Sequence, residues 1–351
     1  MTAPEPAGRL RARVATRAAP PAAAGSAPAP RLPGARWRAR EVVFWLLPAA
    51  AFFAFPHHLV LSSQIMIMGL FALSLDLILG YAGIVSLGHA AFFGIGAYSA
   101  GLLSVHGWGE PLSGLLAAVV VAGACGFVTS FLVVRGQDLT RLMVTLGIGL
   151  MLFEAANKAS SVTGGVDGLS GIATSPLFGR FDFDLSGQTA FWYSFGVLFV
   201  VFAGLRRLVN APFGLSLRGI RDGGRRMPAL GADVAGRLRV AYTIGAAVAG
   251  AAGALLAQTT QFVGLDALGF PRSAELLIML VLGGTGRLYG ALVGAAIFMA
   301  AQDYIAGLAP AYWQFYIGLL LVLIVLFARG GILGGVDRLA ARLRPSGRDA
   351  P

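Results

Sequence analysis

The stretch that decides the fold is GYAGIVSLGHAAFFGIGAYSAG, residues 80–101. Six of its residues are glycine, one is His89, and none is acidic or basic. It is too apolar for a surface loop, and it is too rich in glycine for an ordinary soluble helix. Between membrane helices, by contrast, the apolar driving force is weak, and small residues let the backbones pack closely. The stretch therefore points to a membrane protein.

The composition of the whole chain agrees with a polytopic membrane protein. Of the 351 residues, 57% are hydrophobic and 12% are charged, whereas a soluble domain carries about 25% charged residues. Two of the apolar segments, 42–55 and 272–284, are shorter than the roughly 20 residues that cross a bilayer as a helix. We predict an all-α fold of about ten transmembrane helices. The apolar segments are 42–55, 59–79, 81–105, 112–134, 138–156, 190–209, 240–260, 272–284, 288–306 and 311–328.

The basic residues predict an orientation for these segments. If the N-terminus is cytoplasmic and all ten segments cross, 24 of the 27 basic residues face inside and 3 face outside. This asymmetry fits the positive-inside rule, and omitting either short segment destroys it. We therefore predict that both short segments cross and that both termini are cytoplasmic. The net charge of +11 does not indicate a nucleic-acid partner, because the basic residues lie at helix ends and in loops.

The chain divides into three parts and carries two long loops. Residues 1–40, rich in Ala, Pro and Arg, are interpreted as a disordered basic cytoplasmic arm. Residues 41–330 form the membrane domain, and residues 331–351 form a cytoplasmic tail. The loop 157–189 is expected outside, and the loop 206–239, with eight arginines, is expected inside. One elaborate loop on each side predicts a docking partner on each side.

The glycine-rich pattern returns in LGGTGRLYGALVG, residues 282–294. Both stretches join the end of one apolar segment to the start of the next, which suggests two related halves. The glycines are expected to pack helices or to line a path, and those at the start of the first stretch also allow irregular backbone. The residues assigned to helix packing or to the translocation path are Asp76, Gly80, Gly83, Ser86, Gly88, His89, Gly94, Gly283, Gly284, Gly290 and Gly294.

Two of the polar residues in this list, Asp76 and His89, have alternative interpretations. Asp76, near the inner end of its segment, is a functional candidate by default, and the alternative is a packing hydrogen bond or contact with water at the inner side. His89 either lines a path or makes a hydrogen bond between helices. We favour the hydrogen bond, because no second histidine stands at metal-ligand spacing. The sequence predicts no metal site and no cofactor. It contains neither a phosphate-binding loop of the G-x-x-x-x-G-K-[ST] type nor a catalytic constellation, so we do not expect an enzyme.

The inside loop contains APFGLSLRGIRDGGRRMPALGADVAGRLR, residues 211–239. Its arginines present charge, and Ile220, Met227 and Leu230 are expected to project as apolar knobs. This mixture favours a short helix that docks into a groove on a soluble partner over a loop that only sets orientation and contacts anionic lipid. The residues assigned to docking are Arg218, Arg221, Asp222, Arg225, Arg226, Ala229, Leu230 and Gly231.

These motifs together resemble the permease subunits of branched-chain amino acid ABC importers, and most closely the longer of the two permease types. The stretch at 80–101 resembles the family signature. LRGIRDGGRRMPALGADV (217–234) resembles the cytoplasmic coupling segment, which is followed by the small-residue helix YTIGAAVAGAAGALLAQ (242–258). SAELLIMLVLGGTGRLYGALVGAA (273–296) resembles the late glycine-rich motif. The resemblance covers about residues 60–330.

The resemblance implies an ABC importer permease fold in the bacterial inner membrane, with loop 157–189 periplasmic and loop 206–239 coupling. The implied partners are a second homologous permease subunit, two cytoplasmic ATPase subunits and a periplasmic solute-binding protein. ATP would then be hydrolysed on the ATPase subunits. The implied solutes are branched-chain amino acids, although relatives of this family also import urea, short amides and other small solutes.

One departure and two alternatives accompany this resemblance. The family's coupling segment usually carries an acidic residue and an alanine where this chain has Gly223, Gly224 and Pro228. Because proline disrupts a helix interior, the docking helix is expected to begin at Pro228 or to be shorter. The alternative function is a self-sufficient secondary carrier or channel, and a membrane enzyme ranks third.

Overall fold

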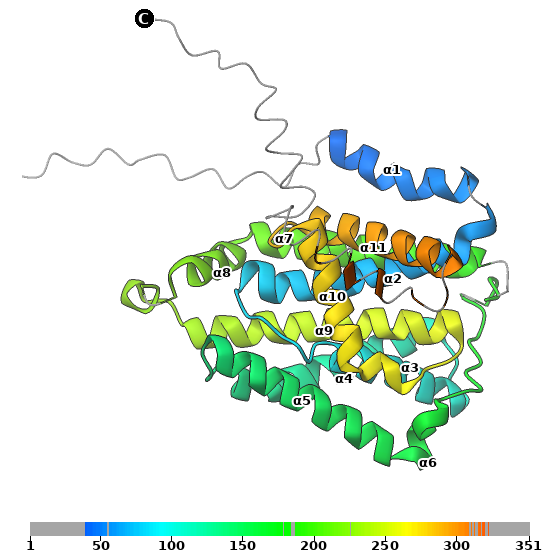
Figure 1. Cartoon of the computed structure of the whole chain (residues 1–351), viewed down its shortest axis with the longest axis horizontal. Helices are drawn as coiled ribbons and strands as arrows, with labels where there is room; N and C mark the ends of the chain where they lie inside the picture. The colour runs from blue at the N-terminus through cyan, green and yellow to red at the C-terminus, as the bar shows by residue number, and fades with distance from the viewer. Residues whose placement is uncertain are drawn as a thin grey trace, which may run out of the picture. The chain divides into compact units, whose positions relative to one another are not determined.

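A computed structural model describes most of the chain, and Figure 1 shows its helices. The described residues, all within one compact unit that spans 37–351, are 39–54, 56–177, 179–183, 187–224, 226–308, 310, 312, 315–316, 318–319 and 322. The helices are α1 (Ala39–Ala54), α2 (Leu59–Leu75), α3 (Ala90–Val105), α4 (Pro111–Val133), α5 (Asp138–Lys158), α6 (Ser160–Thr163), α7 (Gln188–Asn210), α8 (Pro212–Gly223), α9 (Val234–Thr260), α10 (Phe270–Gly283) and α11 (Leu288–Leu308). Shorter helical turns are η1 (Pro56–His58), η2 (Asp76–Tyr81), η3 (Gly165–Asp167), η4 (Pro228–Leu230) and η5 (Leu265–Leu268), of which η2 is π-helical. The described part of the chain contains two isolated β-bridges and no strand, so the predicted all-α class is confirmed.

Six of the described helices are long and apolar enough to cross a membrane: α2 with η2, α4, α5, α7, α9 and α11. α1 and α3 have 16 residues each, and α10 has 14. The expected number of about ten transmembrane helices is therefore not confirmed. The last expected segment, 311–328, lies largely outside the described residues.

α3 and α10 are short because irregular backbone precedes each of them. The sequence predicted one segment over 81–105, but η2 ends at Tyr81 and α3 begins only at Ala90. The backbone between them is held by other elements: Leu87 N donates to Thr145 Oγ1 over 3.3 Å, and Ala90 N donates to Ser273 Oγ over 2.9 Å. Buried irregular backbone requires such partners. The expectation of irregular backbone at these glycines is confirmed, and the predicted helix boundary is wrong.

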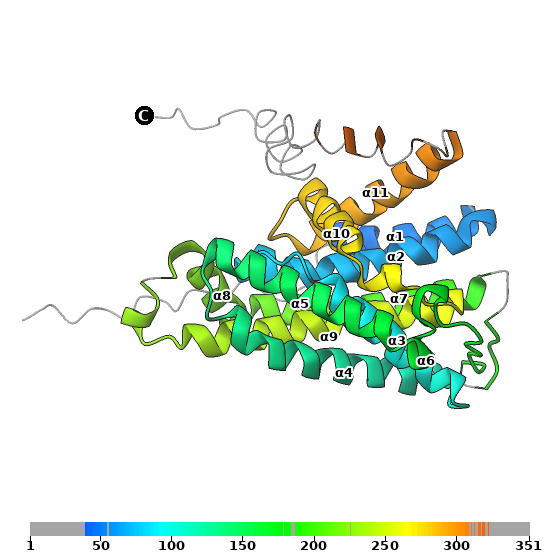
Figure 2. The same ribbon diagram turned by 60° about the horizontal axis from the view of Figure 1, so that its bottom comes forward.

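α9 runs through the middle of the helices, with α2, α3 and α4 packed around it (Figures 1 and 2). Its small residues make this packing close. A β-carbon built on Gly250 would overlap Ala122 of α4, and one built on Gly253 would overlap the carbonyl oxygen of Phe93 in α3. α9 therefore matches the small-residue helix expected at 242–258.

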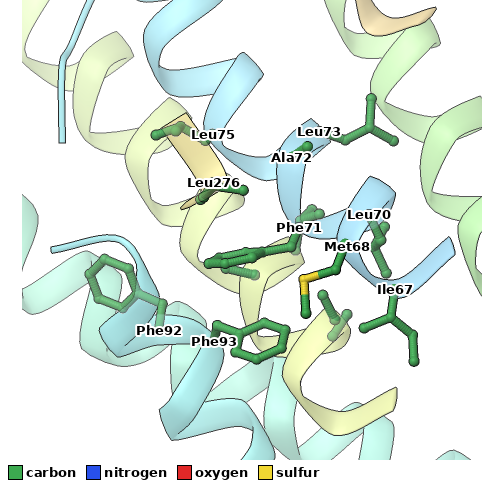
Figure 3. Packing of buried hydrophobic residues seen from close by; sticks show 14 of the residues in the cluster. Ile67, Met68, Leu70, Phe71, Ala72, Leu73, Leu75, Phe92, Phe93 and Leu276 are labelled. Atoms are coloured by element: carbon green, nitrogen blue, oxygen red, sulfur yellow. The ribbon is translucent and has the colours of Figure 1, made fainter. Parts of the chain in front are cut away.

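Large apolar side chains fill the space where α2, α3 and α10 meet (Figure 3). The rings of Phe71 and Phe93 lie 4.5 Å apart, and both side chains are fully buried. Leu276 of α10 is buried beside them. This contact fixes the short helices α3 and α10 against α2.

The loops predicted to face inside gather at one end of the helices. Glu41 at the start of α1 pairs with Arg206 near the end of α7 over 2.7 Å. The guanidinium of Arg239, at the start of α9, lies 4.7 Å from the ring centroid of Phe131 near the end of α4. Figure 1 shows α8 at this same end, on the left of the view.

The loops predicted to face outside gather at the other end. Pro111, at the start of α4, accepts hydrogen bonds through its carbonyl oxygen from Gln258 Nε2 over 2.8 Å and from Tyr193 Oη over 3.2 Å. Thr174, in the loop after α6, donates to the carbonyl oxygen of Gln258 over 3.2 Å. Loops that the sequence places on the same side of the membrane thus lie at the same end of the helices.

Candidate coupling and translocation residues

α8 is the short amphipathic helix expected in the inside loop. It ends before Pro228, which agrees with the expectation of a shorter docking helix rather than with one that begins at Pro228. Pro212 stands at its first turn, where proline costs no hydrogen bond, and the helix ends at Gly223. Pro228 instead opens the turn η4. Leu217 and Ile220 are buried against the membrane helices. The expectation that Ile220 projects outward is therefore wrong.

Two arginines that were assigned to docking face the membrane helices instead. The guanidinium of Arg218 lies 5.1 Å from the ring centroid of Tyr81. Arg221 donates through Nη1 to the carbonyl oxygen of Gly80, and through Nε to Asp222 over 3.0 Å. The side chain of Arg221 is only 39% exposed. Both arginines hold α8 against η2.

The other docking candidates form an exposed tip beyond α8. Leu230 is 79% exposed, and Arg226, Ala229 and Gly231 are exposed with it. Met227 is partly buried. Arg225 lies outside the described residues. We call residues 226–231 the α8 tip.

Asp76 is fully buried in η2, where its carboxylate meets the turn between α10 and α11. Its Oδ1 accepts a hydrogen bond from the backbone nitrogen of Gly286 over 2.7 Å. Oδ2 is buried without a hydrogen-bond partner among the described residues. A β-carbon built on Gly80 would overlap both Asp76 Oδ1 and Gly286 N. Asp76 thus makes the packing hydrogen bond that was the alternative to a functional role.

Asp76, Gly80, Arg221 and Gly286, which we call the α8 junction, join three separate parts of the chain. Gly83 borders the junction with a φ of +73°, and a β-carbon there would lie 2.9 Å from Arg221 Cγ. The sequence selected three members of the junction but not Gly286. The available signal was its place in the glycine-rich 282–294 motif, beside Gly283 and Gly284.

His89 and its neighbours connect α2, α3 and α5. His89 is fully buried, with Nε2 2.8 Å from Ser74 Oγ of α2, so the preferred interpretation of a hydrogen bond between helices is confirmed. Ser86 is buried. A β-carbon on Gly88 would overlap the carbonyl oxygen of Thr145 in α5. These residues fix the irregular backbone before α3.

The second glycine-rich stretch brings α10 and α11 together. A β-carbon on Gly283 would overlap the carbonyl oxygen of Gly290, and one on Gly294 would lie 2.7 Å from Gly283 N. Gly284 ends α10 with a φ of +100°, a conformation that side chains disfavour. These glycines therefore pack α10 against α11. Helix packing was one of the two roles expected for them.

Within α3, the glycine assigned to helix packing, Gly94, is not the one that contacts a transmembrane helix. A β-carbon on Gly94 would overlap the side chain of Leu268 in η5, which is not a transmembrane helix. Gly96 instead faces α9, where its β-carbon would overlap the backbone of Gly250. A register difference of two residues in α3 separates the two faces, and no pattern in the sequence indicates which partner covers which face.

Two large apolar grooves lie away from all of these residues. A groove of about 790 Å³ runs between α4 and α7, and another of about 440 Å³ lies between α1, α2, α7 and α11. Neither is lined by a residue assigned to the translocation path.

Comparison with known proteins gives consistent matches over the same part of the chain. A family model described as "Branched-chain amino acid transport system / permease component" matches residues 59–325. The high-affinity branched-chain amino acid transport system permease protein LivM of Salmonella typhimurium is 29% identical over 299 residues, which cover 78% of this chain and 69% of that protein. The probable branched-chain amino acid transport permease protein LivM of Methanocaldococcus jannaschii is 25% identical over 319 residues, covering 75% and 89%. The high-affinity permease protein LivH of Escherichia coli K12 is 26% identical over 286 residues, covering 76% and 90%. No solved structure matches the chain.

Proposed function

The chain belongs to the permease components of branched-chain amino acid transport systems, and from this we propose how it works in an ATP-driven importer. It forms one half of the membrane pathway, and a second, homologous permease forms the other half. One of two cytoplasmic ATPase subunits binds to the α8 tip and the other binds to the second permease, while a solute-binding protein docks on the opposite face. The chain has no catalytic role of its own in this arrangement.

The observation that carries this proposal is the α8 tip. It presents an exposed leucine, Leu230, beside an exposed arginine, Arg226, at the end where the arginine-rich loops gather. An exposed apolar side chain rimmed by charge is typical of a surface that receives a soluble partner. A loop that only set orientation would need the charge but not the leucine.

The orientation of the chain supports an ATPase at this end. The end that carries the α8 tip also carries the basic loops, and basic loops favour the cytoplasmic side of a membrane. The loop 157–189 lies at the other end, and we propose that it faces the periplasm of a bacterial inner membrane. The N-terminal arm and the C-terminal tail are proposed to be cytoplasmic.

The relatives support a pair of different permeases and a class of solute. The proteins similar to this chain include both LivM and LivH types, and their names give branched-chain amino acid transport. We propose that this chain takes the LivM-type position, and that its solute is a branched-chain amino acid or a related small solute. Urea and short amides are the competing solutes.

Uptake into liposomes tests this proposal. The chain is reconstituted with its candidate second permease and ATPases, binding protein is added, and uptake of leucine, isoleucine, valine, urea and acetamide is followed. We expect uptake of a branched-chain amino acid that requires ATP and every component. Uptake by this chain alone, without ATPase or ATP, would support the secondary-carrier alternative. ATP-dependent uptake of urea or acetamide only would keep the importer and change the solute.

A further inference from the structure

We propose that the α8 junction carries the motion of α8 into the membrane helices, with Arg221 and Asp76 as the positioning residues. The inference rests on the proposed function, because an ATPase docked on the α8 tip supplies the motion. It assigns to Arg221 a role inside this chain rather than at the surface of a partner.

α8 has two different faces. One face holds Leu217 and Ile220, both buried, together with Arg218 and Arg221, which contact η2. Pro212, Leu215 and Asp222, elsewhere on α8, are exposed, and so is most of the α8 tip beyond the helix. A force applied at the tip therefore reaches the membrane helices through the buried face.

Arg221 is linked to two membrane segments at once. It donates a hydrogen bond to Gly80 in η2. A β-carbon on Gly286, in the turn between α10 and α11, would lie 3.1 Å from Arg221 Nη1. Asp76 closes the junction by accepting from Gly286 N over 2.7 Å. Displacement of α8 thus moves the end of α2 and the α10–α11 turn together.

The turn η2 is suited to change shape. It is a π-helical turn of six residues that continues α2, and π-helical turns inside α-helices are rare and occur frequently at functional sites. The residues that follow it, 82–89, lead directly into α3. A change in the winding of η2 therefore shifts the start of α3, which contacts α10 through Ala90 and Ser273.

The coupling ratio in the reconstituted complex tests the junction. The measurement is leucine uptake per ATP hydrolysed, with Arg221→Gln and Asp76→Ala as the variants. We expect the ratio to fall about tenfold or more, which corresponds to losing one hydrogen bond to a charged group. Basal ATP hydrolysis and co-purification of the ATPase should remain. Arg221→Lys and Asp76→Asn, which keep the donor and the Oδ1 acceptor, should restore most of the ratio.

Arg135 provides a matched control for Arg221. Arg135 is exposed in the turn after α4, so Arg135→Gln removes the same charge at the same end and should leave the ratio unchanged. A wild-type ratio in Arg221→Gln and Asp76→Ala would overturn the inference. Loss of ATPase co-purification in Arg221→Gln with normal yield would also overturn it, because Arg221 would then contact the partner.

A distance measurement tests the junction without any solute. Spin labels are placed at Leu215 in α8 and at Thr285 in the α10–α11 turn, both exposed, in a Cys125→Ala background. With Arg221 present, we expect one narrow distance distribution that does not change when the complex is trapped with ADP and vanadate. In Arg221→Gln the distribution should broaden, even in the chain without ATPase. Identical distributions with and without Arg221 would refute the junction. An absence of ATP-dependent uptake in the unaltered complex would instead refute the proposed function.

Discussion

Gly294 and Gly307 lie on the same helix, α11, in opposite surroundings. A β-carbon on Gly294 would overlap the carbonyl oxygen of Met279 in α10, whereas one on Gly307 would have nothing within 4 Å. The obstacle at Gly294 is backbone, which cannot rotate away as a side chain does. At the scale of single residues, glycine is therefore required where two backbones meet and is replaceable elsewhere.

This contrast gives a matched pair of substitutions. Gly294→Ala should force α10 and α11 apart and destabilise the chain by about 1–3 kcal/mol, the usual cost of overpacking. Gly307→Ala should be neutral or stabilise the chain by up to about 1 kcal/mol, because alanine favours helix. Thermal unfolding of the purified protein in detergent measures both. Equal midpoints for the two variants would contradict close packing of α10 on α11.

Gly290 allows a stronger substitution at the same contact. A β-carbon there would lie 2.6 Å from the carbonyl oxygen of Gly284, so Gly290→Leu should lower protein yield and assembly with the second permease. Gly94→Leu should have the same effect, because a β-carbon there would overlap Cγ of the buried Leu268. Yield and co-purification of the second permease measure both effects. Wild-type behaviour of Gly290→Leu would leave this glycine unexplained.

Among the elements, α8 contacts η2, whereas the α8 tip is proposed to bind the ATPase. These two roles need separate substitutions. Reversing the charge at Arg221 disturbs the contact of α8 with η2 as well as any contact with a partner, because Arg221 bonds to Gly80. The tip offers a cleaner site, since Leu230 is 79% exposed. Exposed substitutions usually change folding stability by about 0.5 kcal/mol or less.

We therefore expect Leu230→Asp to weaken binding of the ATPase without lowering protein yield. A leucine that fills a pocket on a partner contributes about 2 kcal/mol when it is a hot spot, which corresponds to roughly a 30-fold weaker complex. Co-purification of the ATPase from detergent measures this. Val166, 86% exposed at the opposite end, supplies the control Val166→Asp, which should co-purify normally. Normal co-purification of Leu230→Asp would remove the α8 tip from the proposed interface.

At the scale of the whole molecule, the two sets of loops meet at opposite ends of the helices. The Glu41–Arg206 ion pair lies at one end, and the hydrogen bonds to Pro111 lie at the other. α7 joins the two ends, since Tyr193 lies near its start and Arg206 near its end. The distribution of basic residues then selects which end is cytoplasmic.

Cysteine labelling in intact cells tests that orientation. In a Cys125→Ala background, Ser175→Cys and Ala229→Cys each place one thiol at an exposed position. We expect a membrane-impermeant maleimide to label position 175 in spheroplasts and position 229 only after permeabilisation. The reverse pattern would invert the topology and place the α8 tip outside the cell.

The sequence predicted the all-α class and the family, because these depend on composition and local motifs, whereas the inside-outside orientation stays a prediction. It did not predict where α3 begins, since that depends on Ser273, which lies 183 positions away in the chain. It assigned Arg218 and Arg221 to a partner because both look like surface charges in an amphipathic helix. Only the position of α8 beside η2 shows that they face inward. The sequence singled out Asp76 as a buried acid. It could not identify the partner of Asp76, because that partner is the backbone nitrogen of Gly286 and not a side chain.

The irregular backbone before α3 also constrains how the protein is made. Residues 82–89 emerge from the ribosome long before Thr145 and Ser273, the side chains that bond to Leu87 N and Ala90 N. Bare amide groups are not stable in lipid, so this part of the nascent chain cannot be released into the bilayer when it is synthesised. It must wait beside the insertion machinery until α10 arrives. A chain truncated after α9 would therefore be a substrate for membrane quality control, however apolar its completed helices are.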